Sequence, residues 1–147
     1  MNPWTALLES LHSALVDELI ERHPEPKPEL GMPQRHRDLV LPAPGLQGAL
    51  ICDVGFTLEA GGETRGFALF AVDAEGALKL KTDSRGLWRS LLGRAGREFV
   101  FRKIKPRLGE PKDLNSAELP AGFAVPSRVI WIPFKLNPGS CYLGVGT

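Results

Sequence analysis

Two apolar runs separated by a glycine pair constrain the fold of this 147-residue chain more than any other feature. The runs occupy residues 48–72 and meet at Gly61-Gly62. Adjacent glycines adopt the positive φ angles of a tight turn, and the Leu, Ile, Val and Phe residues on either side suit a pleated, half-buried strand. The pattern predicts a central β-hairpin with the remaining elements added before and after it.

Three glycines inside these runs, Gly48, Gly55 and Gly66, have no obvious place in a regular strand. Glycine weakens a strand unless a bulge or a second backbone requires it. We therefore expect a bulge or a close backbone contact at these positions.

Further strand signals lie on both sides of the hairpin. Residues 38–41 and 99–105 read as single strands, and residues 77–81, in which apolar residues alternate with lysine, are expected to complete a three-stranded meander. Residues 129–136 and 141–145 predict a terminal hairpin around the turn at 137–140. Pro133 in its first arm lacks an N–H donor and predicts an edge strand or a bulge.

Two helices are predicted. Asn2 and Pro3 form a favourable start for the first, whose apolar residues recur at three- and four-residue spacing until Pro24 ends it. The second covers about residues 85–98 and follows the capping segment 82–84.

The fold class that follows is α+β. We expect an antiparallel sheet of about five to seven strands, with the N-terminal helix and one shorter central helix packed on it. The length, with 43% hydrophobic and 24% charged residues, suits one globular domain over residues 1–147. Within it we expect a helix at 1–23, a proline-rich connector at 24–37, and the sheet with its central helix at 38–147.

The two cysteines, Cys52 and Cys141, fall in predicted strands and are expected to be reduced, buried thiols. The N-terminus lacks the basic start and apolar core of a secretory signal, and no run reaches the roughly 18 apolar residues of a membrane span. We therefore expect a cytoplasmic protein without a membrane partner.

Positive charge concentrates in residues 85–107, while the first 34 residues are acidic. One interpretation is a binding face for phosphate, an acidic protein or single-stranded nucleic acid, with Trp88, Phe99 and Phe101 as stacking partners. The other is that the arginines pair with the acidic helix and the aromatic residues are core, which the net charge of +1 favours. The candidate face comprises Arg85, Arg89, Arg94, Arg97, Arg102, Lys103, Lys105, Arg107 and Trp88.

No motif for catalysis, metal binding or cofactor binding is present in the sequence. The three histidines and two cysteines lack metal-ligand spacing, and there is no nucleophile elbow, Walker sequence or dinucleotide-binding glycine motif. We expect no catalytic residues, no metal and no cofactor. Asp53 lies in an otherwise apolar run and is interpreted as an outward-facing residue of a half-exposed strand.

The order of these segments resembles the chemotaxis phosphatase family of CheC and CheX type. The resemblance covers the N-terminal helix, the strands in 55–72, a later helix, the proline-containing segment 105–114 and the hairpin at 129–145. Members of that family carry a helical Glu-x-x-Asn pair whose Asn positions water at a receiver-domain phosphoaspartate. None of Asn2, Asn115 and Asn137 has a glutamate three residues before it. The resemblance therefore implies a binding relative without catalysis.

The sequence predicts a non-enzymatic protein-interaction or regulatory domain in bacterial signalling, whose partner is another protein or a second copy of the chain. The alternative is a nucleic-acid- or phosphate-binding module that uses residues 85–107. An enzyme with a site assembled from dispersed residues is the third hypothesis.

Overall fold

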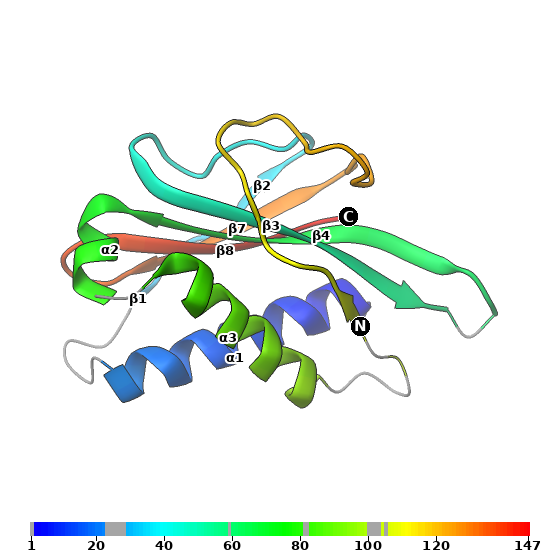
Figure 1. Ribbon diagram of the computed structural model, residues 1–147, viewed down its shortest axis with the longest axis horizontal. Helices are drawn as coiled ribbons and strands as arrows, with labels where there is room; N and C mark the ends of the chain where they lie inside the picture. Colours follow the sequence, from blue (N-terminus) through cyan, green and yellow to red (C-terminus); the bar gives the residue numbers. More distant parts are fainter. Residues whose placement is uncertain (1, 23–28, 59, 81–82, 100–103, 105) are drawn as a thin grey trace.

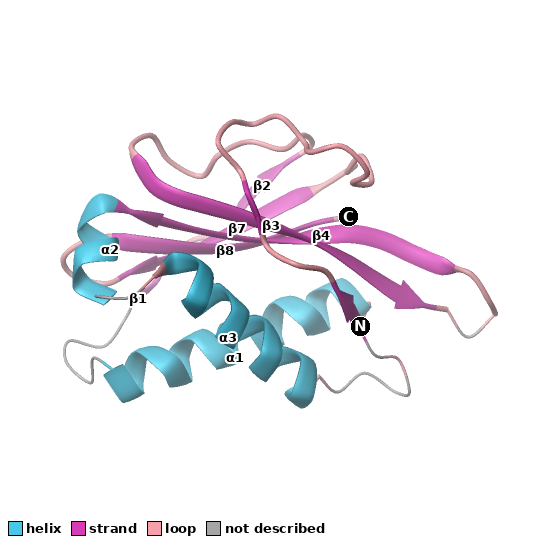
Figure 2. Ribbon diagram, in the orientation of Figure 1, coloured by secondary structure: helices cyan, strands magenta, loops and turns pink. Residues whose placement is uncertain are grey.

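The computed structural model describes residues 2–22, 29–58, 60–80, 83–99, 104 and 106–147. Eight antiparallel strand segments form one sheet in the order β1-β7-β8-β4-β3-β5, with β2 also paired to β7 and β6 also paired to β3 (Figure 2). The elements are α1 (Pro3–Arg22), β1 (Glu29–Leu30), β2 (Gln34–His36), β3 (Leu46–Thr57), β4 (Glu63–Asp73), α2 (Ala74–Leu80), α3 (Ser84–Glu98), β5 (Pro106–Leu108), β6 (Lys112–Asp113), β7 (Val129–Lys135) and β8 (Ser140–Gly146). The α+β class and the N-terminal helix are confirmed.

Helices α1 and α3 lie together on one face of the sheet, and loops cover the opposite face (Figure 1). Because side chains alternate along a strand, β3 contributes to both layers. Val54 and Phe56 pack among the helices, whereas Ile51 packs with the loop residues Leu39 and Leu114. The sheet is therefore buried on both faces.

The predicted central hairpin is confirmed as β3 and β4. Its register pairs Leu50 with Phe70, and Gly61 and Gly62 take φ angles of 92° and 82° in the connecting turn. The outer side of β4 pairs with β8. The hairpin thus lies in the middle of the sheet, with its turn projecting beyond the helices (Figure 1).

The predicted third strand of the meander, residues 77–81, is wrong. Residues 74–80 form α2, and Lys81 lies outside the described residues. The Asp73 carboxylate accepts hydrogen bonds from Gly76 N at 2.7 Å and Ser140 N at 3.0 Å, so it caps this helix while holding the terminal hairpin. The segment in which apolar residues alternate with lysine therefore lies in a short helix and not in a strand.

The predicted strand at residues 38–41 is also wrong, because the strand lies earlier, at β2. Leu39 is buried against the loop-covered face, and the Val40 carbonyl accepts the indole N–H of Trp131 at 2.7 Å. The apolar residues of this segment therefore pack on the sheet without forming a strand. The predicted strand at 99–105 falls mostly on residues 100–103 and 105, which lie outside the described residues.

The terminal hairpin is confirmed as β7 and β8, but β7 is not the outermost strand. The short strands β1 and β2 pair with its outer side on either side of Pro133, and the ladder is interrupted between them. Between them, Gly31 N donates a hydrogen bond to the Pro133 carbonyl at 2.9 Å. The missing N–H of proline therefore breaks the edge pairing into two short pieces.

The helix starts and the cysteines agree with the sequence analysis. Asn2 Oδ1 accepts from Thr5 N at 2.9 Å, and the Asp83 carboxylate accepts from Gly86 N at 3.1 Å. Cys52 and Cys141 are free and buried, and burial raises the pKa of the Cys52 thiol to about 12. None of the described helices is long and apolar enough to cross a membrane.

Candidate functional site

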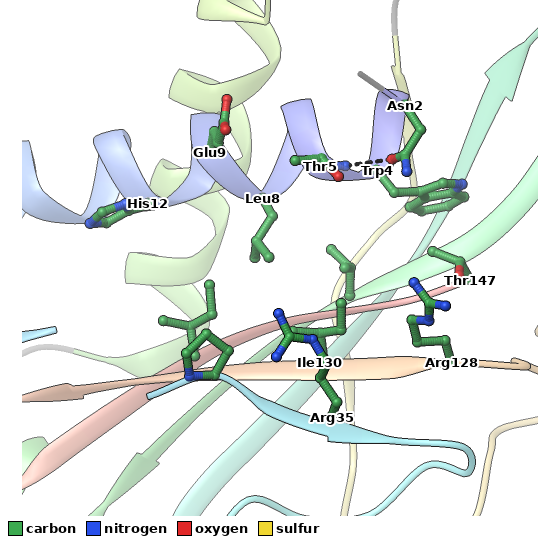
Figure 3. Close-up of a pocket in the computed structure, with 13 residues that line it drawn as sticks. Asn2, Trp4, Thr5, Leu8, Glu9, His12, Arg35, Arg128, Ile130 and Thr147 are labelled. Atoms are coloured by element: carbon green, nitrogen blue, oxygen red, sulfur yellow. Dashed lines mark hydrogen bonds between the residues drawn. The ribbon is translucent and has the colours of Figure 1, made fainter. Parts of the chain in front are cut away.

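A cleft of about 340 Å³ lies between the first half of α1 and the sheet edge formed by β2 and β7 (Figure 3). Helix α1 contributes Trp4, Leu8 and His12, while β7 and β8 contribute an apolar floor. Its volume is near the lower end of the roughly 300–1,000 Å³ range of small-molecule sites. The residues lining the cleft on the sheet side include Pro33, Arg35, Arg128, Ile130, Ile132 and Val145.

The alternation of β7 builds the floor. Val129 and Trp131 are buried on the loop-covered face, so Ile130 and Ile132 face the helices. Both isoleucines are only partly buried because the cleft separates them from α1. Apolar side chains left partly open in this way can contact a bound apolar group.

Two arginines give the sheet side of the cleft its charge. Arg35 is paired in register with Ile130, and the main chain of Arg128 is fixed by hydrogen bonds with Thr147 (Arg128 N to Thr147 O, 3.2 Å; Thr147 N to Arg128 O, 2.9 Å). Figure 3 shows both guanidinium groups rising from the sheet toward α1. Within the described part of the chain neither forms an ion pair. The facing helix contributes the carboxylate of Glu9, and Thr147, the last residue of the sequence, also lines the cleft.

A second charged cluster lies on the loop-covered face of the central hairpin. Arg107 binds Glu63 (Nη2 to Oε1, 2.9 Å) and Asp53 (Nη1 to Oδ2, 2.9 Å), and Arg65 binds Asp53 at 3.1 Å. The hydrogen bonds from Arg107 lower the pKa of the Glu63 carboxyl. Two carboxylates thus balance two guanidinium groups in this cluster. Asp53, interpreted from the sequence as an outward-facing residue, is an ion-paired residue that links β3 to β4 and β5.

Several arginines of the predicted basic face bind carboxylates in different parts of the protein. Arg85 binds Asp113 at 2.8 Å, Arg89 binds Glu110 at 3.3 Å, and Arg94 binds Glu18 at 3.1 Å. Arg97 is exposed and has no ion pair among the described residues. Arg102, Lys103 and Lys105 lie outside the described residues.

Trp88, one of the three proposed stacking residues, is fully buried and stacks on Phe70 with ring centroids 5.6 Å apart. Phe99 stacks on Phe56, and Phe101 lies outside the described residues. Arg107 belongs to the cluster on the other face of the sheet. The nucleic-acid hypothesis stays a prediction, which salt-dependent binding to labelled oligonucleotides tests.

The Glu18–Arg94 ion pair joins the two helices and leads to a stability prediction. Glu18 is only 5% exposed, and its carboxylate also accepts a hydrogen bond from Ser90 Oγ at 3.1 Å. We expect Arg94→Met to lower the free energy of unfolding by about 2–3 kcal/mol, because a nearly buried carboxylate loses its guanidinium partner. Urea unfolding followed by circular dichroism measures the change.

The matched control is Arg89→Met, which breaks an exposed ion pair on the same helix and should change stability by less than about 0.5 kcal/mol. The double variant Glu18→Gln/Arg94→Met should be more stable than the sum of the single changes predicts. Equal losses for Arg94→Met and Arg89→Met would contradict the assignment.

The cleft is the feature that sequence reasoning missed. Arg35 and Arg128 lie in separate segments, and neither belongs to the basic run. The period-2 pattern of β7 was the only available signal, since it places Ile130 and Ile132 on one face. Among the described residues no group of three or more His, Cys, Asp or Glu side chains could hold a metal ion.

Comparison with known proteins places the fold. No family model matches the sequence, and no curated protein matches it. Among solved structures, a CheC-like superfamily protein from Shewanella sp. PV-4 has a TM-score of 0.64 at 15% identity, covering 99% of this chain and 98% of that one. The CheX of the CheX–CheY–BeF3–Mg²⁺ complex from Borrelia burgdorferi has a TM-score of 0.55 at 14% identity, covering 94% and 95%.

The middle domain of FliM from Vibrio alginolyticus also matches, with a TM-score of 0.56 at 11% identity over 99% of this chain and 93% of that one. The chain therefore has the fold of CheC- and CheX-like chemotaxis proteins, and the resemblance seen in the order of its segments is confirmed at the level of the fold.

Proposed function

We propose that this chain is a cytoplasmic protein-binding domain of bacterial signalling, and that its partner is a receiver-type protein similar to CheY. The observation that carries the proposal is the match of nearly the whole chain to chemotaxis proteins, among them a CheX solved together with CheY, BeF3 and Mg²⁺. The match to that CheX covers 94% of this chain, so the two proteins share a backbone framework. Because a shared fold does not by itself carry a function, the receiver partner is a proposal that the binding experiment below tests.

We further propose that the domain binds its receiver partner without hydrolysing the partner's phosphoaspartate. Helices α1 and α3 contain neither asparagine nor glutamine, the amide side chains that can position a water. Asn2 caps α1, and Asn137 lies in the turn of the terminal hairpin. The helical pair of the resembling phosphatases is therefore not available on these two helices.

The sheet edge at residues 29–36 is the proposed contact surface. Leu30, in β1, is 58% exposed, and Met32, in the connection between β1 and β2, is 83% exposed. Exposed apolar side chains beside a sheet edge are typical of protein-binding sites. The edge strands are only two and three residues long, so a partner strand would add few main-chain hydrogen bonds and the contact would rest mainly on the apolar side chains.

The test is binding of purified receiver proteins from the host organism, measured by isothermal titration calorimetry with and without Mg²⁺ and BeF3⁻. We expect one receiver to bind about tenfold more tightly in the BeF3⁻ form, a difference of about 1.4 kcal/mol. The rate of receiver dephosphorylation should not change when the chain is added. An accelerated rate would overturn the proposal of binding without hydrolysis, and the absence of binding by any receiver would overturn the partner.

Surface variants locate the contact. Leu30→Glu/Met32→Glu should weaken receiver binding by at least about tenfold, because two apolar contacts are lost and charge is introduced. The control is Leu58→Glu, an exposed leucine beside the turn of the central hairpin. If instead light scattering shows a dimer that the edge variants dissociate, the partner at this edge is a second copy of the chain.

A further inference from the structure

The cleft between α1 and the β2–β7 edge has features that a flat protein-docking surface does not require. It is about 340 Å³ in volume, and its floor is made of Ile130, Ile132 and Val145. Leu8 extends from α1 toward this floor (Figure 3). A ligand entering it would bury an apolar body between a helix and a sheet.

Two arginines without an ion pair among the described residues line this one cavity, whereas Arg97, which also has none, lies outside it. Arg85, Arg89, Arg94 and Arg107 each bind a carboxylate within the protein. The guanidinium groups of Arg35 and Arg128 form no ion pair with a described carboxylate, although Thr147, whose main-chain oxygen accepts from Arg128 N, lines the same cavity. Two guanidinium groups beside an apolar floor match a ligand that has an anionic head and an apolar body.

We propose that the cleft binds a small amphipathic carboxylate. Arg35 and Arg128 hold the carboxylate through charge-assisted hydrogen bonds, and Leu8, Ile130, Ile132 and Val145 cover the apolar part. Trp4, which lines the same cavity, packs edge-on to Phe56 at 4.8 Å and closes one end. Pro33 and Arg35 line the cleft and also belong to the proposed receiver contact at residues 29–36. The edge variants change Leu30 and Met32, which do not line the cleft, so the two proposals are tested separately.

Decanoate is the probe, and isothermal titration calorimetry of the full chain at low salt is the measurement. We expect decanoate to bind at least about tenfold more tightly than decanol or decylamine, because only the carboxylate forms hydrogen bonds to both guanidinium groups. Inorganic phosphate alone should bind more weakly than decanoate, since it leaves the apolar floor uncovered.

The double variant Arg35→Ala/Arg128→Ala should weaken decanoate binding by about tenfold or more while leaving the circular dichroism spectrum unchanged. The matched control Arg89→Ala/Arg97→Ala removes two exposed arginines outside the cleft and should leave decanoate binding unchanged. A second variant, Ile132→Phe, fills the floor and should weaken binding with both arginines in place.

Three outcomes would overturn the inference. They are the absence of decanoate binding, equal binding of decanol and decanoate, and unchanged binding by the Arg35→Ala/Arg128→Ala variant. An acidic, apolar peptide that binds where decanoate does not would assign the cleft to a protein segment and overturn the small-molecule site. Receiver binding is measured separately, with the Leu30→Glu/Met32→Glu variant.

Discussion

Replacement of Trp131 by alanine is expected to lower the free energy of unfolding by about 3–5 kcal/mol, a large part of the about 5–15 kcal/mol that holds a domain folded. Trp131 is fully buried beneath the loops of the sheet face opposite the helices. Its indole N–H donates to the Val40 carbonyl at 2.7 Å, and its ring meets Tyr142 edge-on. Alanine leaves a cavity and removes the bond that holds residues 37–45 over the sheet.

Phenylalanine variants separate the hydrogen bond from the packing. Trp88 is as deeply buried as Trp131, but its indole N–H has no acceptor among the described residues. Trp131→Phe should therefore cost about 1–2 kcal/mol more than Trp88→Phe, since only the first leaves a carbonyl without its donor. Urea unfolding followed by far-ultraviolet circular dichroism measures both. A larger loss for Trp88→Phe would show that the bond to Val40 contributes little.

Local signals predicted the elements whose ends are fixed by neighbouring residues. The side chains of Asn2 and Asp83 cap α1 and α3 as expected, and Gly61-Gly62 turns the central hairpin. The failure at residues 77–81 has a long-range cause. Asp73 caps α2 and also binds Ser140 N, and β8 occupies the place beside β4 that a third meander strand would take. No pattern within ten residues reports that pairing.

The candidate site was harder to predict than the fold for the same reason. Arg35 and Arg128 are 93 positions apart in the sequence and become neighbours of one cavity only because β2 pairs with β7. The basic run at 85–107 was visible because its charges are adjacent in sequence, yet Arg94 turns to α1 and Arg107 to the opposite face of the sheet. A charge count reports composition, whereas availability to a ligand depends on which partners the fold supplies.

The glycines of the central hairpin show how tertiary contacts decide what sequence can only suggest. Gly48 lies beside a register shift in the β3–β4 ladder, and a Cβ there would have only Ser84 Oγ nearby, at 3.9 Å. At Gly66 a Cβ would collide with the Gly146 carbonyl oxygen and would lie 2.5 Å from the Trp4 ring. Two glycines of one hairpin therefore have opposite tolerance for a side chain.

Gly66→Val is accordingly expected to lower the free energy of unfolding by about 3 kcal/mol or more, at the upper end of the range for overpacking. The Gly146 carbonyl belongs to β8, which is paired with both β4 and β7, so it cannot move away without breaking a ladder. Trp4 would have to leave its contact with Phe56 and would disturb the wall of the cleft.

The matched control is Gly48→Val, which adds the same side chain to the same hairpin where there is room. Its effect should stay within about 1 kcal/mol of zero, because valine suits a strand and the bulge there leaves space. Denaturant midpoints of the two variants make the comparison. Equal destabilisation by both would mean that valine is penalised by the strand itself, and that the close approach of α1 and β8 to Gly66 does not set the cost.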